Sequence, residues 1–335
     1  MIRRYLVTGA TGFLGRAVVR ELEWKAAEVT ALVMKGDPYA SELPENVRKV
    51  TGDVLDAGSL DRFFSHADRD TCVIHCAGIV SVASDPGGEL YRVNVGGTDN
   101  ILRCCRMKRV AKLVYVSSVH AIPEKRKGEI ITEDAVFSPD LVRGAYAKSK
   151  AEATELVLEA AARGLDASVV FPSGIIGPGD PAGGSFTSML RKYTEGRLRA
   201  AVRGGYDFVD VRDAARSIVA CSAKGGPGKG YILSGHYASV EDILRFAGKA
   251  LGCGHRVLYL PLTAAKLAAP FYERRSLRKG EPLFFTPCSV SLLDANCSFS
   301  NESAARDLGH AARSVEESVR DTVYWIHTRD RLASG

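Results

Sequence analysis

The sequence lacks the long apolar run that a membrane-spanning helix requires. A bilayer crossing needs about 18 consecutive apolar residues. The nearest candidate, LPLTAAKLAAPF at 260–271, is short, holds a lysine and contains two prolines. The chain begins with MIRRYLV and runs directly into a glycine-rich turn, without the hydrophobic segment and cleavage site of a signal peptide. We therefore expect a cytoplasmic protein without membrane insertion.

Disulfide and metal-binding patterns are also missing. The eight cysteines contain no CxxC pair and no evident disulfide framework, and several stand in apolar surroundings such as TCVIHCAG. Small buried thiols of a reducing compartment explain them better than metal ligands do. No bound metal is expected.

No stretch of one charge sign marks a nucleic-acid surface. The chain has 45 Lys plus Arg and 39 Asp plus Glu, which leaves a formal charge of +6. That surplus is dispersed, and its densest run, EKRKGE at 124–129, has glutamates at both ends. Nucleic-acid binding would need a stripe of one sign. We expect a small-molecule substrate as the partner, and a homodimer stays open.

The first half of the chain does contain a regular alternation of short β-branched runs and longer helical patterns. A helix from 13 to 24 is expected, and further helices at 58–64, 89–108 and 146–163. Six strands are expected at 4–9, 28–34, 47–53, 71–77, 112–118 and 166–172. Near-continuous apolar strands separated by helices indicate an α/β fold with a parallel sheet covered on both faces.

A glycine-rich turn joins the first expected strand to the first expected helix. In TGATGFLG, Gly9 permits a tight turn, Gly12 lets the backbone approach phosphates, and Gly15 allows the helix to pack closely on the strand. A dinucleotide pyrophosphate binds at such a helix N-terminus. The spacing is GxxGxxG rather than GxGxxG, but strand, turn and helix stand in the required order. We predict a Rossmann-type, doubly wound parallel sheet that binds a dinucleotide.

The pattern changes after Pro172, which predicts a second lobe. GIIGPGDPAGGS is a Gly/Pro-rich loop, and short strands (YDFVDV, GYILSG) then mix with helices at 239–252 and 314–326. We expect residues 1–172 to form the dinucleotide-binding domain, with 206–235 interleaved into it. Residues 173–335 should form mainly a smaller, mixed α/β lobe that binds substrate.

The stretch GAYAKSK at 144–150 places Tyr146 and Lys150 on one face of a helix, one turn apart. On its own the pattern is weak, because many exposed helices carry such a pair by chance. A phenol titrates near pH ~10. A lysine ammonium beside it would lower the pKa of the tyrosine and let it move protons near neutral pH. The rest of the chain decides between the two interpretations.

Seven motifs stand in order along the chain: TGATGFLG, GDV (52–54), HCAG (75–78), NVGGT (94–98), YVSS (115–118), YAKSK (146–150) and FPSGIIGPGD (171–180). FVDVRDAA (208–215) and a tail from Phe299 to Trp325 follow them. In this order and spacing the chain resembles the extended short-chain dehydrogenase/reductase family, within the NAD-dependent epimerase/dehydratase superfamily. The stretch EPLFFTPCSVSLL looks like the branch of dihydroflavonol reductases and 3β-hydroxysteroid dehydrogenases.

The resemblance implies that Tyr146 and Lys150 are the catalytic pair. Tyr146 would give a proton to a carbonyl oxygen, or take one from an alcohol in reverse, and Lys150 would also reach the nicotinamide ribose. A serine at the end of the fifth strand would hold the substrate oxygen. Alignment with the family favours Ser118 over Ser117 for this role, and strand-end capping is the alternative role of the pair.

The same resemblance implies the dinucleotide contacts. Asp53 and Val54 would contact the adenine, and Asn94 would support the nicotinamide site or be only structural. The other implied cofactor contacts are Gly9, Thr11, Gly12, Phe13, Leu14, Gly15, Cys76, Ala77, Gly78, Ser117, Tyr146, Lys150, Pro172 and Ser173. Candidate substrate contacts are His120, Tyr206 and Phe208, whereas His75 is interpreted as an oriented core histidine.

The residues after the second expected strand bear on the choice between NADP and NAD. An acid there would accept the adenosine ribose hydroxyls and repel a 2′-phosphate. The chain has Val33 and Met34 instead, followed by Lys35. Relatives that prefer NADP often have an arginine at the Met34 position, so the chain departs from that pattern too. Absence of the acid and presence of Lys35 favour NADP over NAD, unless Lys35 is only a surface lysine.

Two missing polar residues bear on the substrate class. Nucleotide-sugar members of the family have an Asn and an Arg that grip the diphosphate, and here Gly174 and Tyr206 occupy those positions. This favours an oxidoreductase that reduces a ketone or aldehyde on a mainly apolar molecule, or oxidises the alcohol. A nucleotide-sugar epimerase or dehydratase, with Arg203 or Arg212 as a displaced anchor, is the alternative. A dinucleotide-binding regulator without turnover is the second alternative, although such proteins usually lose the Tyr or the Lys.

Overall fold

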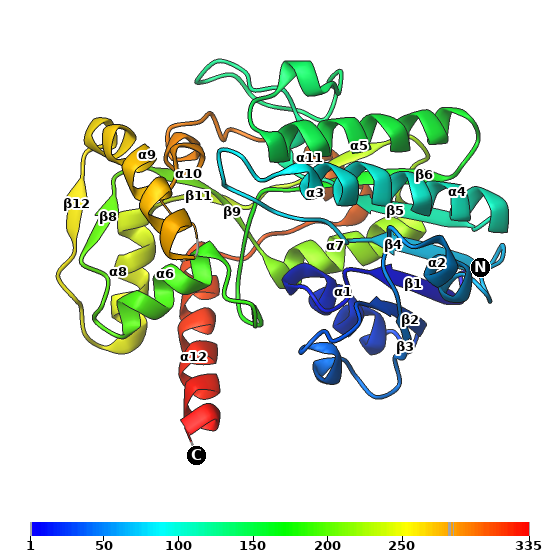
Figure 1. Ribbon diagram of the computed structural model, residues 1–335, viewed down its shortest axis with the longest axis horizontal. Coiled ribbons are helices and arrows are strands. Elements are labelled where there is room, and N and C mark those ends of the chain that lie inside the picture. Colours follow the sequence, from blue (N-terminus) through cyan, green and yellow to red (C-terminus); the bar gives the residue numbers. More distant parts are fainter. Residues whose placement is uncertain (1, 281–282, 284, 335) are drawn as a thin grey trace.

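The fold is known from a computed structural model that describes residues 2–280, 283 and 285–334. Within these residues, seven strands form the main sheet in the order β10-β6-β5-β4-β1-β2-β3 (Figure 1). All neighbours in it are parallel. The strands are β1 (Arg4–Thr8), β2 (Glu28–Val33), β3 (Arg48–Thr51), β4 (Thr71–His75), β5 (Lys112–Val116), β6 (Ala167–Pro172) and β10 (Gly230–Leu233). The predicted α/β class with a doubly wound parallel sheet is confirmed.

Helices cover both faces of this sheet, as the apolar strands predict. One face holds α1 (Phe13–Trp24), α7 (Val211–Lys224) and α11 (Glu302–Leu308), and the other holds α2 (Ala57–Phe63), α4 (Thr98–Lys108) and α5 (Ala145–Ala162). Successive side chains of a strand point to opposite faces. Val7, Ile74 and Val114 therefore pack in the first layer, and Leu6, Val73 and Leu113 pack in the second.

Short polar side chains define where several helices begin. The Asp56 carboxylate accepts hydrogen bonds from the first amides of α2, and Asp210 accepts from the amide of Arg212 at 2.9 Å, where α7 begins. Ser239 and Asp242 form a reciprocal capping box at the start of α8 (Val240–Leu251). Each satisfies amide groups that a helix N-terminus leaves without an intrahelical partner.

The second lobe is built on a small mixed sheet. In it β9 (Gly205–Asp210) pairs in parallel with β7 (Gly174–Ile176) and antiparallel with β11 (His236–Ser239). A separate pair joins β8 (Ala200–Val202) and β12 (Leu258–Leu260). The described helices of this lobe are α6 (Ser185–Thr194), α8, α9 (Leu262–Lys279), α10 (Pro287–Leu292) and α12 (Val315–Ser334). Of the stretch 206–235, α7 and β10 join the main layer, whereas β9 lies in the small sheet.

The helix expected at 89–108 is interrupted. It consists of α3 (Gly88–Tyr91), a π-helical segment at Arg92–Gly97, and α4. Short 3₁₀ turns lie at Ala40–Glu42, Val119–Ala121 and Pro139–Leu141. Among the described residues, none of the helices combines the length and the apolar character that a bilayer crossing requires.

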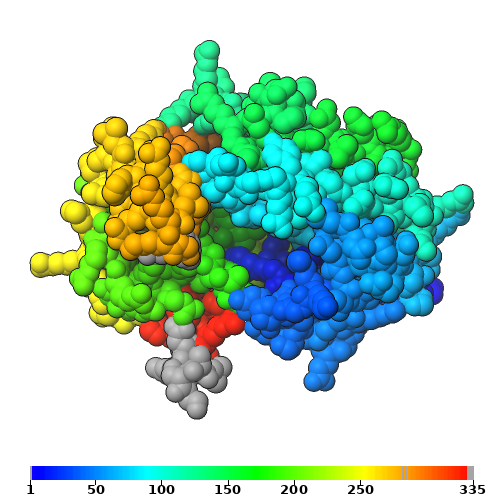
Figure 2. Space-filling model, viewed as in Figure 1, coloured from blue at the N-terminus to red at the C-terminus, as the bar shows by residue number. Residues whose placement is uncertain are grey.

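The two lobes meet around a hollow. Figure 2 shows it where the cyan segment of α3 and α4, the blue N-terminal segment and the green part of the second lobe come together. The carboxyl ends of the main strands open toward this junction, because the loops that follow β4, β5 and β6 lead into α3, α5 and the second lobe. Residues from both lobes can therefore contribute to one site.

Candidate active site

The glycine-rich turn lies where the strand order reverses, between β1 and β4. Gly9 has φ +65°, and a Cβ atom on it would stand 2.6 Å from the amide nitrogen of Ala77. A Cβ on Gly15 would stand 2.0 Å from the carbonyl oxygen of Gly9. Only glycine fits either position. The turn is therefore held against the end of β4, at the switch point where doubly wound sheets bind their ligands.

The N-terminus of α1 has the features of an anion site. Gly12 is its N-cap and supplies no side-chain cap, and the first turn of the helix contains no acidic residue. The amide groups of Phe13 and Leu14 belong to this first turn, which has no intrahelical acceptor for them. A dinucleotide pyrophosphate fits such a cradle of glycine backbone and free amides.

The loop after β2, where the adenosine ribose is predicted to bind, contains an acid that sequence reasoning missed. Lys35 is exposed after β2, but Asp37 lies two residues further on, and its carboxylate accepts a hydrogen bond from the Thr11 hydroxyl at 2.6 Å. Asp37 thus stands beside the glycine turn. The sequence did contain this acid, four residues after the end of β2. It was missed because an acid that binds the ribose was expected directly after the strand.

The predicted adenine contacts lie where β3 ends. The amide nitrogen of Leu55 donates to the Asp53 carboxylate at 2.9 Å, and Asp53 itself donates its amide to Ser59 at 3.0 Å. Val54 is buried, and a Cβ atom on Gly97 would stand 2.7 Å from its side chain. This loop is therefore packed against the π-helical segment.

Tyr146, Lys150 and Ser118 come together at the carboxyl end of β5. Tyr146 is the second residue of α5, which begins after Gly144 with φ +90°. Ser118 follows β5, and its side chain lies near enough to the Tyr146 hydroxyl to lower the pKa of that phenol. Lys150 is buried, and its Nζ atom donates to the carbonyl oxygen of Val116 at 2.8 Å. Ser118 and Tyr146 thus lie near each other at the junction of β5 and α5. The Lys150 ammonium instead contacts Tyr115 and Val116 of β5.

Burial controls the protonation of this group. It raises the pKa of Tyr146 to about 12, against the opposing effect of the nearby Ser118 side chain. It lowers the pKa of Lys150 to about 8. The sequence led us to expect a tyrosine pKa lowered by the lysine. In the chain alone burial raises the pKa of Tyr146 instead, and the Lys150 ammonium donates to the Val116 carbonyl rather than to the phenol. Tyr146 is therefore a neutral phenol, the form that donates a proton.

The two serines that end β5 have different surroundings. The Ser117 hydroxyl hydrogen-bonds Thr154 of α5 at 2.7 Å, in the buried layer beneath the site. The Ser118 oxygen accepts from the amide of His120 at 3.2 Å and lies beside Tyr146. Ser117 therefore connects β5 to α5, whereas the Ser118 hydroxyl lies at the site.

Asn94 connects three parts of the site. It is buried in the π-helical segment, and its Oδ1 atom accepts from the amide of Ile79 at 2.7 Å. Its Nδ2 atom donates to the Ile79 carbonyl and to the Ser149 hydroxyl, each at 3.0 Å. π-Helical segments are frequent at functional sites. Here the segment orients the side-chain amide of Asn94, which holds the loop after β4 against α5.

The end of β4 contributes backbone rather than reactive side chains. His75 is buried between the hydroxyls of Thr8 (2.6 Å) and Thr98 (3.1 Å), and burial lowers its pKa to about 3. It is a neutral core histidine. Burial raises the pKa of the Cys76 thiol to about 12, so no thiolate forms there near neutral pH. A Cβ atom on Gly78 would stand 3.4 Å from Lys150 Nζ, so only a small residue leaves this approach open.

Aromatic side chains from the turn after β5 and from β9 gather beside Tyr146. His120 stacks on Tyr206 with ring centroids 5.8 Å apart and meets Tyr146 edge-on at 6.1 Å. Phe208 packs against Tyr206 at 6.2 Å. Burial lowers the pKa of His120 to about 4, which leaves the imidazole neutral. The predicted substrate residues therefore form one cluster of aromatic rings.

Pro172 and Ser173 lie at the end of β6, next to this cluster. Pro172 pairs with Leu233 in the sheet, and the amide of Ser173 donates to the carbonyl of Leu233 at 3.2 Å. Burial raises the pKa of Asp207, and the nearby Ser173 side chain opposes that rise. The Ser173 amide thus joins the end of β6 to β10, while its buried hydroxyl has no hydrogen-bond partner among the described residues.

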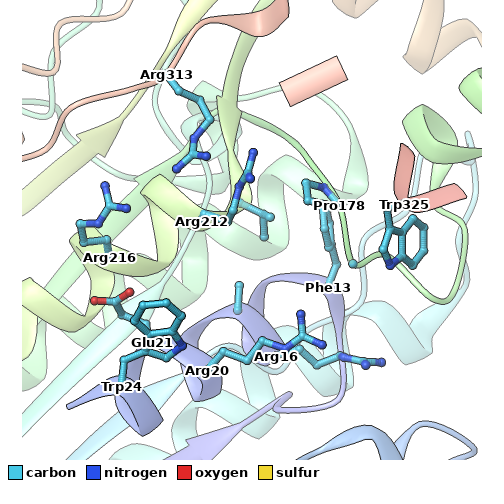
Figure 3. A pocket seen from close by; sticks show the side chains of 13 residues that line it. Phe13, Arg16, Arg20, Glu21, Trp24, Pro178, Arg212, Arg216, Arg313 and Trp325 are labelled. Carbon is cyan, nitrogen blue, oxygen red and sulfur yellow. The ribbon is translucent and has the colours of Figure 1, made fainter. Parts of the chain in front are cut away.

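The two arginines considered as diphosphate anchors differ in their surroundings. Arg212 is held by Asp210 at 2.8 Å and by Asp321 at 2.8 Å. It lines a cleft of about 530 Å³ between α1 and α7, together with Arg16 and Arg216 (Figure 3). Its guanidinium is therefore committed to structural ion pairs, which argues against the anchoring role considered above. Arg203, between β8 and β9, is exposed.

A glycine turn at the switch point and a Tyr/Lys/Ser group at the end of β5 define a dinucleotide-binding protein of the Rossmann class. The chain belongs to the NAD dependent epimerase/dehydratase family, which matches residues 5–233. The resemblance to the extended short-chain dehydrogenase/reductase family is thereby confirmed. The family makes the chain an NAD(P)-dependent oxidoreductase or epimerase.

Individual relatives cover almost the whole chain. Sterol demethylase protein B of Methylococcus capsulatus is 29% identical over 98% of this chain and 99% of its own length. A Synechocystis protein provisionally named dihydroflavonol 4-reductase is 30% identical over 96% of this chain and 94% of its own. The crystal structure of gox2253 superimposes with a TM-score of 0.83 and 28% identity, and covers 98% of this chain and 99% of its own.

Proposed function

We propose that the protein is an NAD(P)-dependent oxidoreductase that reduces a ketone or aldehyde on a mainly apolar small molecule, or oxidises the corresponding alcohol. The observation that carries this proposal is the contact of the Tyr146 ring with His120, which stacks in turn on Tyr206. A nucleotide-sugar enzyme would have a cationic side chain here that binds the diphosphate, whereas this site has aromatic rings. Aromatic and apolar walls with few polar groups suit an apolar substrate.

The chain's own residues would perform the proton chemistry. Tyr146 gives its hydroxyl proton to the carbonyl oxygen, and Ser118 donates a hydrogen bond that holds this oxygen in place. Lys150 is cationic below about pH 8 and stabilises the phenolate that Tyr146 becomes. When bound, the nicotinamide supplies the hydride that the carbonyl carbon accepts. In the reverse direction the phenolate takes the proton of an alcohol.

Names of two relatives support an apolar substrate. The Methylococcus protein is named for sterol demethylation and the Synechocystis protein for dihydroflavonol reduction, and both names describe largely apolar ring systems. The family also contains enzymes that act on sugars, so an epimerase or dehydratase is the alternative. Arg203 would then be the anchor, because its side chain is exposed.

A substrate screen distinguishes these functions. Purified protein is incubated with reduced cofactor and a panel of apolar ketones and aldehydes, and cofactor absorbance is followed. In parallel, UDP-, GDP- and dTDP-sugars are incubated with the protein and examined by mass spectrometry and NMR. We expect stoichiometric cofactor oxidation with a member of the first panel. Sugar inversion or dehydration without net cofactor consumption would overturn the proposal, and absence of turnover in both panels would favour the dinucleotide-binding regulator.

For the cofactor we propose NADP over NAD, with Lys35 contacting the 2′-phosphate. Asp37 opposes this preference, because its carboxylate lies near the same loop. One charged hydrogen bond contributes about 1.5–3 kcal/mol. Lys35→Ala should therefore lower the ratio of NADPH to NADH affinity by at least about tenfold, and Asp37→Asn should raise it, as measured by calorimetry. An unchanged ratio in Lys35→Ala would contradict the assignment.

A further inference from the structure

Helix α9 exposes large apolar side chains that no described part of the chain covers. Leu267 is 85% exposed and Phe271 is 71% exposed. The buried residues of α9 are Ala265, Ala269 and Glu273, which follow one another at intervals of four. The helix is thus attached through one narrow stripe. Contiguous exposed apolar groups of this kind mark interaction sites rather than ordinary surface.

The same helix concentrates positive charge. Residues 262–279 contain five Lys or Arg and one Asp or Glu, although the whole chain carries a net charge of only +6. The single acid, Glu273, points inward. Arg274, Arg275 and Arg278 are exposed and form no ion pair within the described residues. The cationic surplus that is dispersed elsewhere is therefore concentrated here.

Apolar and cationic groups share one side of α9. A helix turns by about 100° per residue, so Leu267, Phe271 and the arginines at 274, 275 and 278 all lie opposite the buried stripe. We call these five residues the α9 patch. Figure 1 shows α9 in the second lobe, running from beside β8 and β12 toward α6. Because the patch lies opposite the buried stripe of the helix, it faces away from the body of the protein.

We propose that the α9 patch docks the protein on the surface of an anionic lipid bilayer. Leu267 and Phe271 would enter the boundary between headgroups and acyl chains, and the arginines would contact lipid phosphates while their stems stay in the apolar zone. The helix lies in the plane of the surface and does not cross it. This proposal does not depend on which reaction the protein catalyses.

Charge favours a bilayer over a second copy of the chain. A symmetric dimer brings the same patch of both copies together, so Arg274, Arg275 and Arg278 would face their equivalents without acids between them. An anionic lipid surface instead offers opposite charge to all three arginines.

Hydrogen bonds connect helix α9 to a loop at the edge of the active site. Glu273 accepts hydrogen bonds from the amide and the hydroxyl of Ser84, each at 2.7 Å. Ser84 lies in the loop after β4. Asn94 fixes the first part of this loop by accepting a hydrogen bond from the Ile79 amide. Because Glu273 lies on the buried stripe, docking of α9 would place the helix between the bilayer and this loop at the edge of the site.

The test is vesicle flotation of the full chain. The vesicles consist of phosphatidylcholine alone or of phosphatidylcholine and phosphatidylglycerol in equal parts. We expect the protein to float with the anionic vesicles, less so at high salt, and not with phosphatidylcholine alone. Leu267→Ser with Phe271→Ser, and Arg274→Glu with Arg275→Glu and Arg278→Glu, should each weaken binding at least about tenfold.

A matched control removes exposed apolar residues elsewhere. Trp24 and Met107 are 88% and 72% exposed on the main domain, so Trp24→Ser with Met107→Ser should bind vesicles as the parent protein does. Circular dichroism and the thermal midpoint verify that each variant is folded. Failure of the parent protein to bind anionic vesicles, or equal binding by the α9 variants, would overturn the proposal. So would a dimer in size-exclusion chromatography that Leu267→Ser with Phe271→Ser dissociates, because a second copy would then occupy the patch.

Discussion

At the scale of single residues, burial sets the proton chemistry of the site. The phenol of Tyr146 stays neutral because its pKa is about 12, and the ammonium of Lys150 is destabilised, with a pKa of about 8. Each group keeps the protonation state that the proposed reduction uses near neutral pH. Two variants test these roles separately.

Replacing Tyr146 by Phe should lower turnover by at least about a hundredfold, since the general acid is lost. Dinucleotide affinity and the thermal midpoint should remain nearly unchanged, because only one hydroxyl is removed. Steady-state kinetics and calorimetry measure the two effects. Tyr237→Phe is the matched control, since that side chain is exposed on β11. Turnover near the parental value in the Tyr146 variant would refute the proposed mechanism.

The pKa of Lys150 predicts a pH dependence of cofactor affinity. The ammonium that is proposed to contact the ribose is present below about pH 8 and is lost as the pH rises through that value. Above it, affinity for the dinucleotide should fall by up to about tenfold per pH unit. Titrations at several pH values measure this. Lys150→Met should give weak, pH-independent affinity, whereas Lys148→Met, two residues away, should keep the parental profile.

The lowered pKa of Lys150 also makes the free energy of unfolding depend on pH. The unfolded lysine titrates near ~10.4, above its folded pKa of about 8. Between these values the unfolded chain binds more protons, so the contribution of Lys150 to the free energy of unfolding rises with pH. In Lys150→Met this rise should be absent from denaturation curves. A parental pH dependence in that variant would mean that Lys150 is not the responsible group.

At the scale of elements, the π-helical segment is important because it orients the Asn94 side chain toward Ile79 and Ser149. An uninterrupted helix from 89 to 108 was expected from the sequence pattern. The observed segment widens at Arg92–Gly97, where Asn94 hydrogen-bonds both polar groups of the Ile79 backbone. Such a local widening depends on contacts from β4 and α5, which are distant in sequence.

Asn94→Ala should lower the free energy of unfolding by about 1–3 kcal/mol, because the Ile79 amide and carbonyl lose their partner. It should also raise the KM for the dinucleotide, since the loop after β4 is released. Chemical denaturation and kinetics measure the two effects. Asn100→Ala is the matched control: its amide makes one hydrogen bond, to the Val54 carbonyl at 3.0 Å. Equal effects of both substitutions would contradict a special role for Asn94.

At the scale of the whole molecule, buried ion pairs join the main domain to the C-terminal segment. Arg313 donates to both carboxylate oxygens of Asp213, at 2.9 and 2.8 Å. Burial raises the pKa of Asp213, but the hydrogen bonds from Arg313 outweigh it and hold the pKa below its usual range. This pair connects α7 with the residue stretch before α12.

Arg313→Met should destabilise the fold by about 3 kcal/mol, the lower end of the range for a broken buried pair, since Arg216 still contacts Asp213. The effect should shrink at low pH, where Asp213 is protonated in both proteins. Chemical denaturation at two pH values measures this. Arg320→Met, which removes a half-exposed partner of Asp321, should change stability by less than about 1 kcal/mol. An equally small effect of Arg313→Met would exclude the buried pair as a major support.

Local sequence predicted the main sheet closely. The six strands expected in the first half lie within two residues of β1 to β6 at each end, because apolar β-branched runs bounded by turns favour a buried strand with few alternatives. The second lobe was harder to predict. Strands as short as β7, β8 and β12, three residues each, leave no periodic pattern to read.

The sequence by itself determined the features that depend on near neighbours. Gly9 and Gly15 belong to one turn, and Tyr146 and Lys150 to one helix, so their spacing along the chain already places them. Tertiary structure alone decided the direction of the Ser117 and Ser118 hydroxyls, the pairing of Arg212 with Asp321, and the rise of the Tyr146 pKa. It also turned LPLTAAKLAAPF into part of an exposed helix. Burial and long-range contacts control these features, and both arise only when distant segments pack together.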